Sequence, residues 1–271
     1  MQRLSGTLPR PLVLVPTMGA LHAGHFALVK KAKRFSARAG STVVSLFVNP
    51  TQFGPAEDFH KYPRTFQADC ELLRNAKCDL VFAPNVDDMY FSDKSTTVVE
   101  SDLSRVMCGA SRPGHFSGVC TVVAKLFNIA RPDIAIFGEK DFQQLAILRR
   151  MARDLNFPVR IVSHPTVREE DGLALSSRNR FLSIEERRGA TVIYSTLLGA
   201  EHKIRNGWNR TRRVEHWMRT SISKEKLAKI DYVVAVDPVT LQGSDRIITP
   251  VLLAAAVFFG STRLIDNRLL E

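Results

Sequence analysis

The sequence predicts an α/β fold: a doubly wound parallel sheet in a first domain, followed by a smaller C-terminal α+β domain. Two patterns support this fold class. Apolar segments of strand length alternate with segments of helical periodicity up to about residue 166, which is the order of a parallel sheet covered by helices. Beyond that point, helices come first and short strands follow. We therefore expect a domain boundary between residues 166 and 167, with domains spanning 1–166 and 167–271.

The first domain should contain short buried strands and the helices that connect them. Strands are expected at residues 12–15, 43–48, 80–83, 134–137 and 159–162, and helices at 26–39, 66–75 and 118–129, with another beginning near Lys140. Polar motifs follow the first, second and fourth strands. Because the carboxyl ends of parallel strands meet at one edge of the sheet, these motifs should gather where such sheets bind nucleotides.

The second domain should contain a helical segment at 189–219 and strands at 232–236, 247–249 and 262–266. Ser183 and Glu186 have the spacing of a capping box, which marks the start of a helix. We expect this domain to close over the first, which would exclude water and strengthen charge interactions between them.

The segment from Pro16 to His25 links the first strand to a helix and carries two histidines, His22 and His25. A helix N-terminus offers free backbone N–H groups and a favourable dipole to an anion, Gly24 would let a phosphate approach the backbone, and the imidazoles could bind its oxygens. The pattern therefore predicts an ATP phosphate site. Its candidate residues are Met18, Gly19, Ala20, Leu21, His22, Ala23, Gly24 and His25. The same histidines could instead be helix-cap residues, or metal ligands with a third group from elsewhere.

A second motif, from Leu175 to Asn179, follows an acidic turn and places Ser176 and Ser177 before Arg178. The planar guanidinium of Arg178 suits a leaving pyrophosphate, and the serines can donate through hydroxyl or backbone groups. This motif predicts a triphosphate clamp. The alternative is a solvated loop that caps the following helix.

A third motif repeats the order of strand, glycine and helix at Gly138, Glu139, Lys140 and Asp141. A cation in the first turn opposes the helix dipole, so Lys140 should be paired with an anion such as a phosphate. The alternative is a surface lysine paired with Glu139 or Asp141.

The net charge of +11 is unevenly distributed. Residues 1–56 hold seven Lys or Arg and no acid, and residues 201–230 hold nine against three acids. Positive potential near the first motif would attract anionic substrates. Nucleic acid is the rival explanation, although no aromatic platform or DNA-binding motif accompanies the charge, so we expect no nucleic-acid partner.

The sequence contains no stretch that is long enough to cross a membrane and no apolar leader with a cleavage site, so we expect a cytoplasmic protein. Its four cysteines form no Cys-x-x-Cys pair, and reduced thiols fit best. We do not expect a zinc site, because the two histidines lack a cysteine cluster to complete the ligand shell.

The order of these and further motifs resembles the pantothenate synthetase family almost end to end. Its pattern is matched at residues 16–25, 47–53, 62–65, 112–116, 121–127, 137–141, 143–144, 175–179 and 262–267. His22, Gly24 and His25 alone would indicate only a nucleotidyltransferase. The resemblance implies a Rossmann-like fold of the HIGH-type nucleotidyltransferases, a homodimer, and an AMP-forming ligase that joins pantoate to β-alanine with ATP and Mg²⁺.

The reaction implied by the resemblance has two steps. The pantoate carboxylate attacks the α-phosphorus of ATP and releases pyrophosphate, and the β-alanine amine then attacks the pantoyl adenylate and releases AMP. The resemblance makes His25 the proton donor, while His22, Lys140 and Arg178 would neutralise developing charge.

Two glutamines, Gln52 and Gln144, are the expected pantoate ligands, because an amide offers both donor and acceptor to hydroxyls and a carboxylate. Gln143 is interpreted as a polar residue of the helix surface. Pro16, Met18 and Val167 would pack against substrate or adenine, although each could be simple core.

Two other functions stay open. A related nucleotidyltransferase would move AMP onto a phosphorylated acceptor and would have a basic acceptor pocket in place of the glutamines. A nucleic-acid binder would lose affinity steeply as salt increases.

Overall fold

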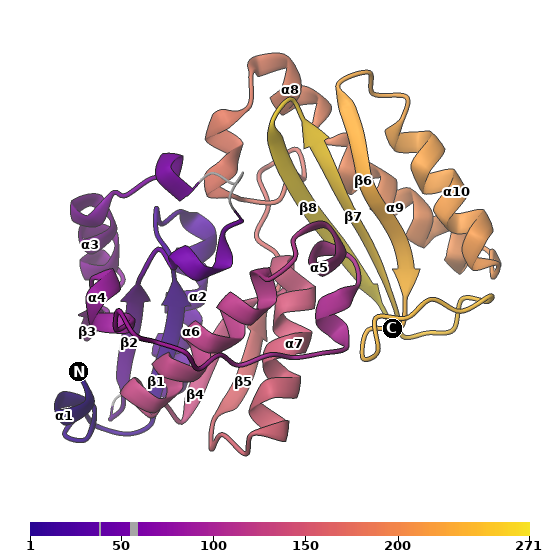
Figure 1. The fold of residues 1–271 in the computed structure, drawn as a ribbon. Coiled ribbons are helices and arrows are strands. Elements are labelled where there is room, and N and C mark those ends of the chain that lie inside the picture. The colour runs from indigo at the N-terminus through magenta and orange to yellow at the C-terminus, as the bar shows by residue number, and fades with distance from the viewer. Residues whose placement is uncertain (38, 55–58) are drawn as a thin grey trace.

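The computed structural model describes residues 1–37, 39–54 and 59–271 and contains two sheets (Figure 1). The first is a five-stranded parallel sheet in the order β3-β2-β1-β4-β5, and the second is a three-stranded antiparallel sheet in the order β6-β7-β8. This architecture confirms the predicted α/β class with a smaller C-terminal α+β part.

The strands of the parallel sheet lie close to their predicted positions. They are β1 (Leu12–Thr17), β2 (Ser41–Leu46), β3 (Leu80–Phe82), β4 (Ile134–Gly138) and β5 (Arg160–His164). The three central strands are buried on both faces, which explains why they read as short continuous apolar runs.

The helices of this part are α1 (Gln2–Ser5), α2 (Ala23–Ser36), α3 (Phe66–Asn75), α4 (Val86–Met89), α5 (Cys108–Ser111), α6 (His115–Ala130) and α7 (Phe142–Asp154). Helix α2 begins earlier than predicted because His22 is its N-cap. It ends at Ser36 rather than at residue 39, and residue 38 lies outside the described residues. Lys140 lies not in α7 but in a preceding 3₁₀ turn, Glu139–Asp141.

The sheet is covered by helices on both faces. Val13 and Val15 of β1 belong to the core that includes residues of α2 and α3. Leu12 and Leu14 point to the opposite face, where α6 and α7 pack. Since β1 lies between β2 and β4, the polar segments that follow these three strands meet at one edge, as expected, while β3 lies at the margin.

The C-terminal part consists of α8 (Ile184–Gly189), α9 (Val192–Arg205), α10 (Thr211–Ile222), β6 (Ala228–Val236), β7 (Val251–Phe259) and β8 (Thr262–Leu270). The capping box of Ser183 and Glu186 at the start of α8 is confirmed. The single helical segment predicted at 189–219 is wrong. The chain instead turns between α9 and α10, where Gly207 has a φ of 92° that favours glycine.

The strand predicted at 247–249 is also wrong, because this segment is irregular and Ile248 is 72% exposed. The true central strand is β7. Val251 and Leu253 on one face pack into the core with α9 and α10, whereas Leu252 and Ala254 on the other belong to the core of the first part. Burial of both faces removes the alternation by which a strand is recognised.

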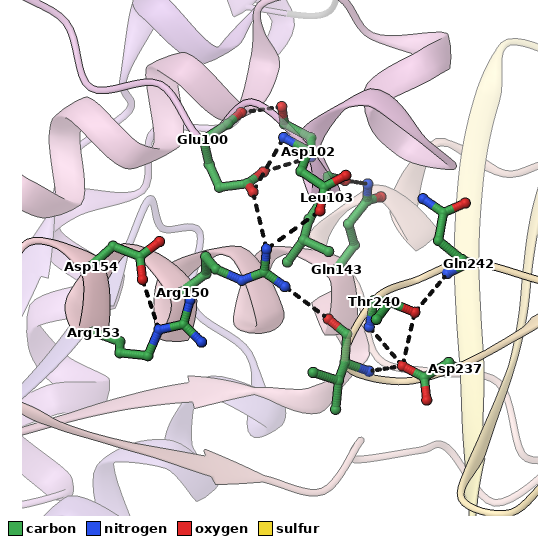
Figure 2. A network of polar contacts seen from close by, with 12 residues as sticks. Glu100, Asp102, Leu103, Gln143, Arg150, Arg153, Asp154, Asp237, Thr240 and Gln242 are labelled. Atoms are coloured by element: carbon green, nitrogen blue, oxygen red, sulfur yellow. Dashed lines mark hydrogen bonds and ion pairs between the residues drawn. The ribbon is translucent and has the colours of Figure 1, made fainter.

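Polar contacts also join the two parts of the chain (Figure 2). Arg150 of α7 contacts Glu100 and Asp102 and donates to the carbonyl of Val239, in the loop after β6. The boundary at 166/167 stays a prediction. In the described part of the chain, no helix has the length and apolar character needed to cross a membrane.

Candidate active site

A cavity of about 250 Å³ lies at the carboxyl edge of the parallel sheet. It is lined by most of the predicted site residues, namely Met18, His22, Gly24, His25, Gln52, Gly138, Lys140, Asp141, Gln144, Val167, Leu175, Ser176, Ser177 and Arg178. The lining does not include Gly19, Ala20, Leu21, Ala23 or Glu139. The three ATP-site motifs and the two glutamines therefore meet in one place.

His22 and His25 form a reciprocal cap at the N-terminus of α2. His22 Nδ1 accepts the backbone N–H of Gly24 at 3.1 Å, and His25 Nδ1 accepts the backbone N–H of His22 at 3.3 Å. The ring centroids are 4.1 Å apart. Because Nδ1 of each neutral ring is an acceptor, the proton must lie on Nε2. Each ring can therefore donate one hydrogen bond to a ligand in the cavity.

Both imidazoles are held neutral. Burial, followed by the positive charge of Lys140, lowers the pKa of His22 from 6.5 to about 4. Burial, followed by the charges of His22 and Lys140, lowers the pKa of His25 from 6.5 to about 3. At neutral pH the pair supplies hydrogen-bond donors and carries no net charge.

Two glycines shape the start of α2 and the turn before it. A Cβ at Gly24 would lie 2.9 Å from Cε1 of His22, so glycine makes room for that ring. Gly19 has a φ of 71°, and a Cβ there would lie 2.6 Å from Asp69 Oδ2. The buried Asp69 carboxylate accepts the backbone N–H of Leu21, and Tyr62 donates to the carbonyl of Gly19. Gly19 and Leu21, which do not line the cavity, are therefore held by α3 and the segment that precedes it.

Lys140 is one of the cations that line the cavity, together with Arg112 and Arg178. Neither Glu139 nor Asp141 forms an ion pair with it in the described residues, and Glu139 instead accepts from Ser163 at 2.7 Å. The surface-pair alternative for Lys140 is therefore wrong. Its 3₁₀ turn is held from the second part of the chain, because Asn267 Nδ2 donates to the carbonyls of Glu139 and Lys140, each at 2.9 Å.

The serine-rich loop at residues 175–179 leads into a capped 3₁₀ turn. Ser176 Oγ accepts the backbone N–H of Arg178 at 3.2 Å and so caps the 3₁₀ turn Ser177–Phe181. A bidentate pair joins Arg168 before the loop to Asp266 of β8, at 2.6 and 2.9 Å. Arg178 lines the cavity. The segment before the loop is therefore anchored to the C-terminal sheet, and the loop lines the same cavity as the histidines.

The orientation of Gln52 is set by Asn49. Asn49 Nδ2 donates to Gln52 Oε1 at 3.1 Å, and Asn49 Oδ1 accepts from the Tyr90 hydroxyl at 2.8 Å. Gln52 Nε2 then lies 3.0 Å from the sulfur of Met18 and keeps a second N–H. The Gln52 side chain is thus a fixed donor at the cavity wall.

Gln143 and Gln144 are neighbours with different surroundings. The interpretation of Gln143 as a helix-surface residue is wrong, since it is 4% exposed. It binds the backbone of Leu103, Val106 and Cys108, and its bond to Leu103 is visible in Figure 2. Gln144 lines the cavity and makes no side-chain hydrogen bond within the described residues.

Part of the cavity lining is apolar. This part includes Pro16, Phe47, Val119, Val122, Val123, Leu126 and Phe137, from the sheet and from α6. In the same lining, His115 Nδ1 donates to the carbonyl of Gln52 at 2.8 Å, and Arg112 also binds that carbonyl. None of the cations of residues 201–230 lines the cavity.

Several residues of the site were not predicted. Asn49, Asp69, Arg112, His115 and Asn267 position or line it. Asn49 follows a predicted strand, and Arg112, His115 and Asn267 lie in segments that match the family pattern, but none of these signals assigned the residues to the site. Apart from Asn49, these residues reach the site from distant segments.

No group of three or more His, Cys, Asp or Glu residues within the described ranges could hold a metal ion. The four cysteines are free thiols, of which Cys108 and Cys120 are buried. Asp141 is the one carboxylate that the described residues contribute to the cavity lining.

Comparison with known proteins identifies the family. The family model described as pantoate-beta-alanine ligase matches residues 2–269. A pantothenate synthetase from Thermoanaerobacter sp. is 50% identical over 268 residues, which cover 99% of this chain and 93% of that protein.

Solved structures agree. Pantothenate synthetase from Thermus thermophilus matches with a TM-score of 0.93 and 46% identity over 98% of this chain and 96% of that one. The ligase from Francisella tularensis, described as complexed with beta-gamma ATP and beta-alanine, matches with a TM-score of 0.79 and 32% identity over 99% and 94%. The chain therefore belongs to the pantoate-beta-alanine ligase family, the pantothenate synthetases, and is an enzyme of the ligase class.

Proposed function

We propose that this enzyme condenses pantoate with β-alanine in two steps through a pantoyl adenylate, at the expense of ATP. The observation that carries the proposal is the convergence of two neutral imidazoles, one lysine without an ion pair in the described residues and two glutamines on one cavity. Activation is needed because a carboxylate is a poor acyl donor, and transfer to AMP provides a leaving group.

In the first step, the pantoate carboxylate attacks the α-phosphorus of ATP and pyrophosphate leaves. His22 and His25 would donate through Nε2 to phosphate oxygens, and Lys140 and Arg178 would stabilise the negative charge that develops there. Donors fixed before the reaction stabilise the transition state without reorganisation. Neutral imidazoles suit this role because they donate without binding the product pyrophosphate as tightly as a charged pair would.

The nucleotide would extend along the predicted ATP-site residues. Ser176, Ser177 and the N-terminus of α2 would hold the triphosphate, since backbone and hydroxyl donors bind anions there. Met18, Val167 and Leu175 would contact the nucleoside, while Gly19, Ala20, Leu21 and Ala23 would act through the backbone of the turn.

Pantoate would lie against the apolar part of the cavity lining. Gln52 and Gln144 would bind its polar groups, and the valines of α6 would surround its dimethyl carbon. The two glutamines argue against a nucleotidyltransferase with a phosphorylated acceptor, because such an enzyme would have a basic acceptor pocket in their place.

In the second step, the β-alanine amine attacks the acyl carbon and AMP leaves. A larger cavity of about 880 Å³ shares Arg112, Lys140 and Arg178 with the first. We propose that β-alanine approaches from this side, where the cations favour its carboxylate.

Mg²⁺ fits a site of this kind without a protein cage. It is commonly bound by one or two carboxylates together with substrate phosphates, and Asp141 lines the cavity. The ion would neutralise charge on the phosphates. A homodimer and a cytoplasmic location remain predictions from the resemblance and the sequence.

The test is an assay of AMP release by the purified enzyme. AMP should form only when ATP, pantoate and β-alanine are all present, and pantothenate should form in equal amount. AMP release that does not depend on pantoate, or transfer of AMP to a phosphorylated acceptor, would refute the proposal.

A further inference from the structure

Asn267 of β8 connects the C-terminal part of the chain to the turn that carries Lys140. Its side-chain amide Nδ2 donates to two successive backbone carbonyls, those of Glu139 and Lys140, each at 2.9 Å. A primary amide has two N–H groups, so each carbonyl can receive one of them. Asn267 does not line the cavity of the histidines, whereas Lys140 does. The asparagine therefore acts on this cavity through the backbone of the lysine.

The neighbouring residue of β8, Asp266, anchors the segment that leads to the other cation of the triphosphate site. Its carboxylate accepts both terminal nitrogens of Arg168, at 2.6 and 2.9 Å. Arg168 lies in a short hairpin, which closes where the backbone N–H of Leu175 donates to the carbonyl of Val167 at 3.0 Å. The serine-rich loop with Arg178 follows directly. Two adjacent residues of one strand thus hold the segments of both cations.

The two side chains leave β8 on opposite faces, as adjacent residues of a strand do. Asp266 is paired across the sheet with Ala255, which belongs to the C-terminal core. Asn267 is paired with Ala254, which belongs to the core of the first part. Directly opposite side chains share a face of the sheet. Because one strand joins them, the amide fixes Lys140 in relation to the hairpin that the carboxylate holds.

We propose that Asn267 is a positioning residue for Lys140, which it holds at a set distance from Arg178; this inference rests on the proposed function. Lysine carries a compact charge on a flexible stem of four carbons, so the place of its ammonium group depends on how firmly its backbone is held. In the first step both cations stabilise charge on the same triphosphate, and groups fixed in advance do so without reorganisation. Misplacement by about 1 Å can lower a rate about 100-fold.

The experiment measures the single-turnover rate constant of pyrophosphate release from ATP, with pantoate and β-alanine present. Asn267→Ala should lower this rate constant about 10- to 100-fold. Asn267→Asp keeps the shape of the side chain but has no N–H group when ionised, and it should be slowed at least as much. A rate near that of wild type in Asn267→Asp would mean that the side chain acts by packing, and would overturn the proposal. The rate constant does not depend on the fraction of folded enzyme.

A double-mutant cycle separates the positioning of Lys140 from a general structural effect. In a Lys140→Ala background, Asn267→Ala should change the rate constant less than about threefold, because its effect passes through the lysine. Fully additive effects would overturn the proposal. So would a raised KM for β-alanine with an unchanged rate of pyrophosphate release, since Asn267 also lines the larger cavity and would then be a ligand of that substrate.

Arg150→Ala is the matched control. It removes a polar contact between the two parts of the chain, to the carbonyl of Val239, and neither residue lines the two cavities (Figure 2). Its rate constant should stay within about twofold of wild type, as expected for a site independent of Lys140. An equal fall in this variant would show that any weakened contact between the parts slows the reaction, and would overturn a specific role for Asn267. No pantoate-dependent pyrophosphate release by wild type would refute the proposed function instead.

Discussion

His25 Nδ1 accepts the backbone N–H of His22 at 3.3 Å, so the second histidine of the motif caps the first. His22 Nδ1 in turn accepts from Gly24. The start of α2 and the tautomers of both rings are thus set by the same hydrogen bonds. Protonation of either ring at Nδ1 would break its cap, and this adds to burial and Lys140 as a reason for the neutral state.

Both histidines should remain neutral well below their ordinary pKa of 6.5. Their pKa values of about 4 for His22 and about 3 for His25 are depressed by burial and by Lys140. Their Cε1 proton resonances should therefore not shift between about pH 8 and pH 5. A midpoint near 6.5 for His22 or His25 would contradict the cap geometry.

The same pKa values predict the direction in which the free energy of unfolding changes as the pH is lowered. Between about pH 6.5 and pH 3 the unfolded chain binds more protons at these histidines than the folded chain does, so the free energy of unfolding should fall as the pH decreases through this window. Above pH 6.5 the contribution is fully present. Urea unfolding at pH 7 and pH 5 should show a smaller difference for His25→Asn than for wild type.

His25→Ala should lower AMP release by two to three powers of ten, because removal of one fixed transition-state donor has about that effect. The variant should remain folded, with α2 somewhat weakened by loss of the cap. His202→Ala, at an exposed position of α9, is the control and should keep full activity. Activity near that of wild type in folded His25→Ala would remove this residue from the catalytic set.

Gln52→Ala and Gln144→Ala should raise the KM for pantoate far more than the KM for ATP, since the lost hydrogen bonds belong to the acid. Asn49→Ala should act in the same direction as Gln52→Ala, because it releases Gln52 Oε1. Gln67→Ala, at an exposed position of α3, is the matched control. Equal effects on both substrates would place the glutamines outside the pantoate site.

Asp266→Ala should lower the free energy of unfolding by about 3–5 kcal/mol, the usual effect of leaving a buried charge unpaired. Asp266 is 4% exposed and holds both terminal nitrogens of Arg168, which also packs on the ring of Tyr194. Asp154→Ala breaks an exposed pair with Arg153 and should change stability little. Similar urea midpoints for the two variants would show that Arg168 finds another partner.

Much of the fold follows from local pattern, but part of the site does not. Strands β1 to β5 were predicted because short apolar runs end at polar motifs, and the cavity lining was predicted because those motifs follow adjacent strands. Asn267 was missed because it reaches Lys140 across 127 residues of chain, and Asp69 because it reaches Leu21 across 48. Strand β7 was missed because the first part of the chain buries its second face, a tertiary contact that leaves no local periodicity.

The last prediction concerns the order of the two steps. Ser176 and Arg178 lie on a loop anchored to the C-terminal sheet, whereas Gln52 and Gln144 belong to the first part of the chain. If adenylate formation needs only ATP and pantoate, rapid mixing of these two with enzyme should release a burst of pyrophosphate before any β-alanine is added. The adenylate should persist because a closed site excludes water from its acyl carbon.

Variants separate the two half-reactions in this experiment. Arg178→Ala should reduce the pyrophosphate burst, because its charge would act on the leaving group. It should leave the rate at which preformed adenylate reacts with amine unchanged, because pyrophosphate has already departed. Arg180→Ala, at an exposed position two residues further on, is the control for loss of positive charge. If wild type released no burst until β-alanine was added, the amine would have to take part before pyrophosphate leaves. The two-step mechanism through the adenylate would then be wrong, and a concerted or differently ordered reaction would replace it.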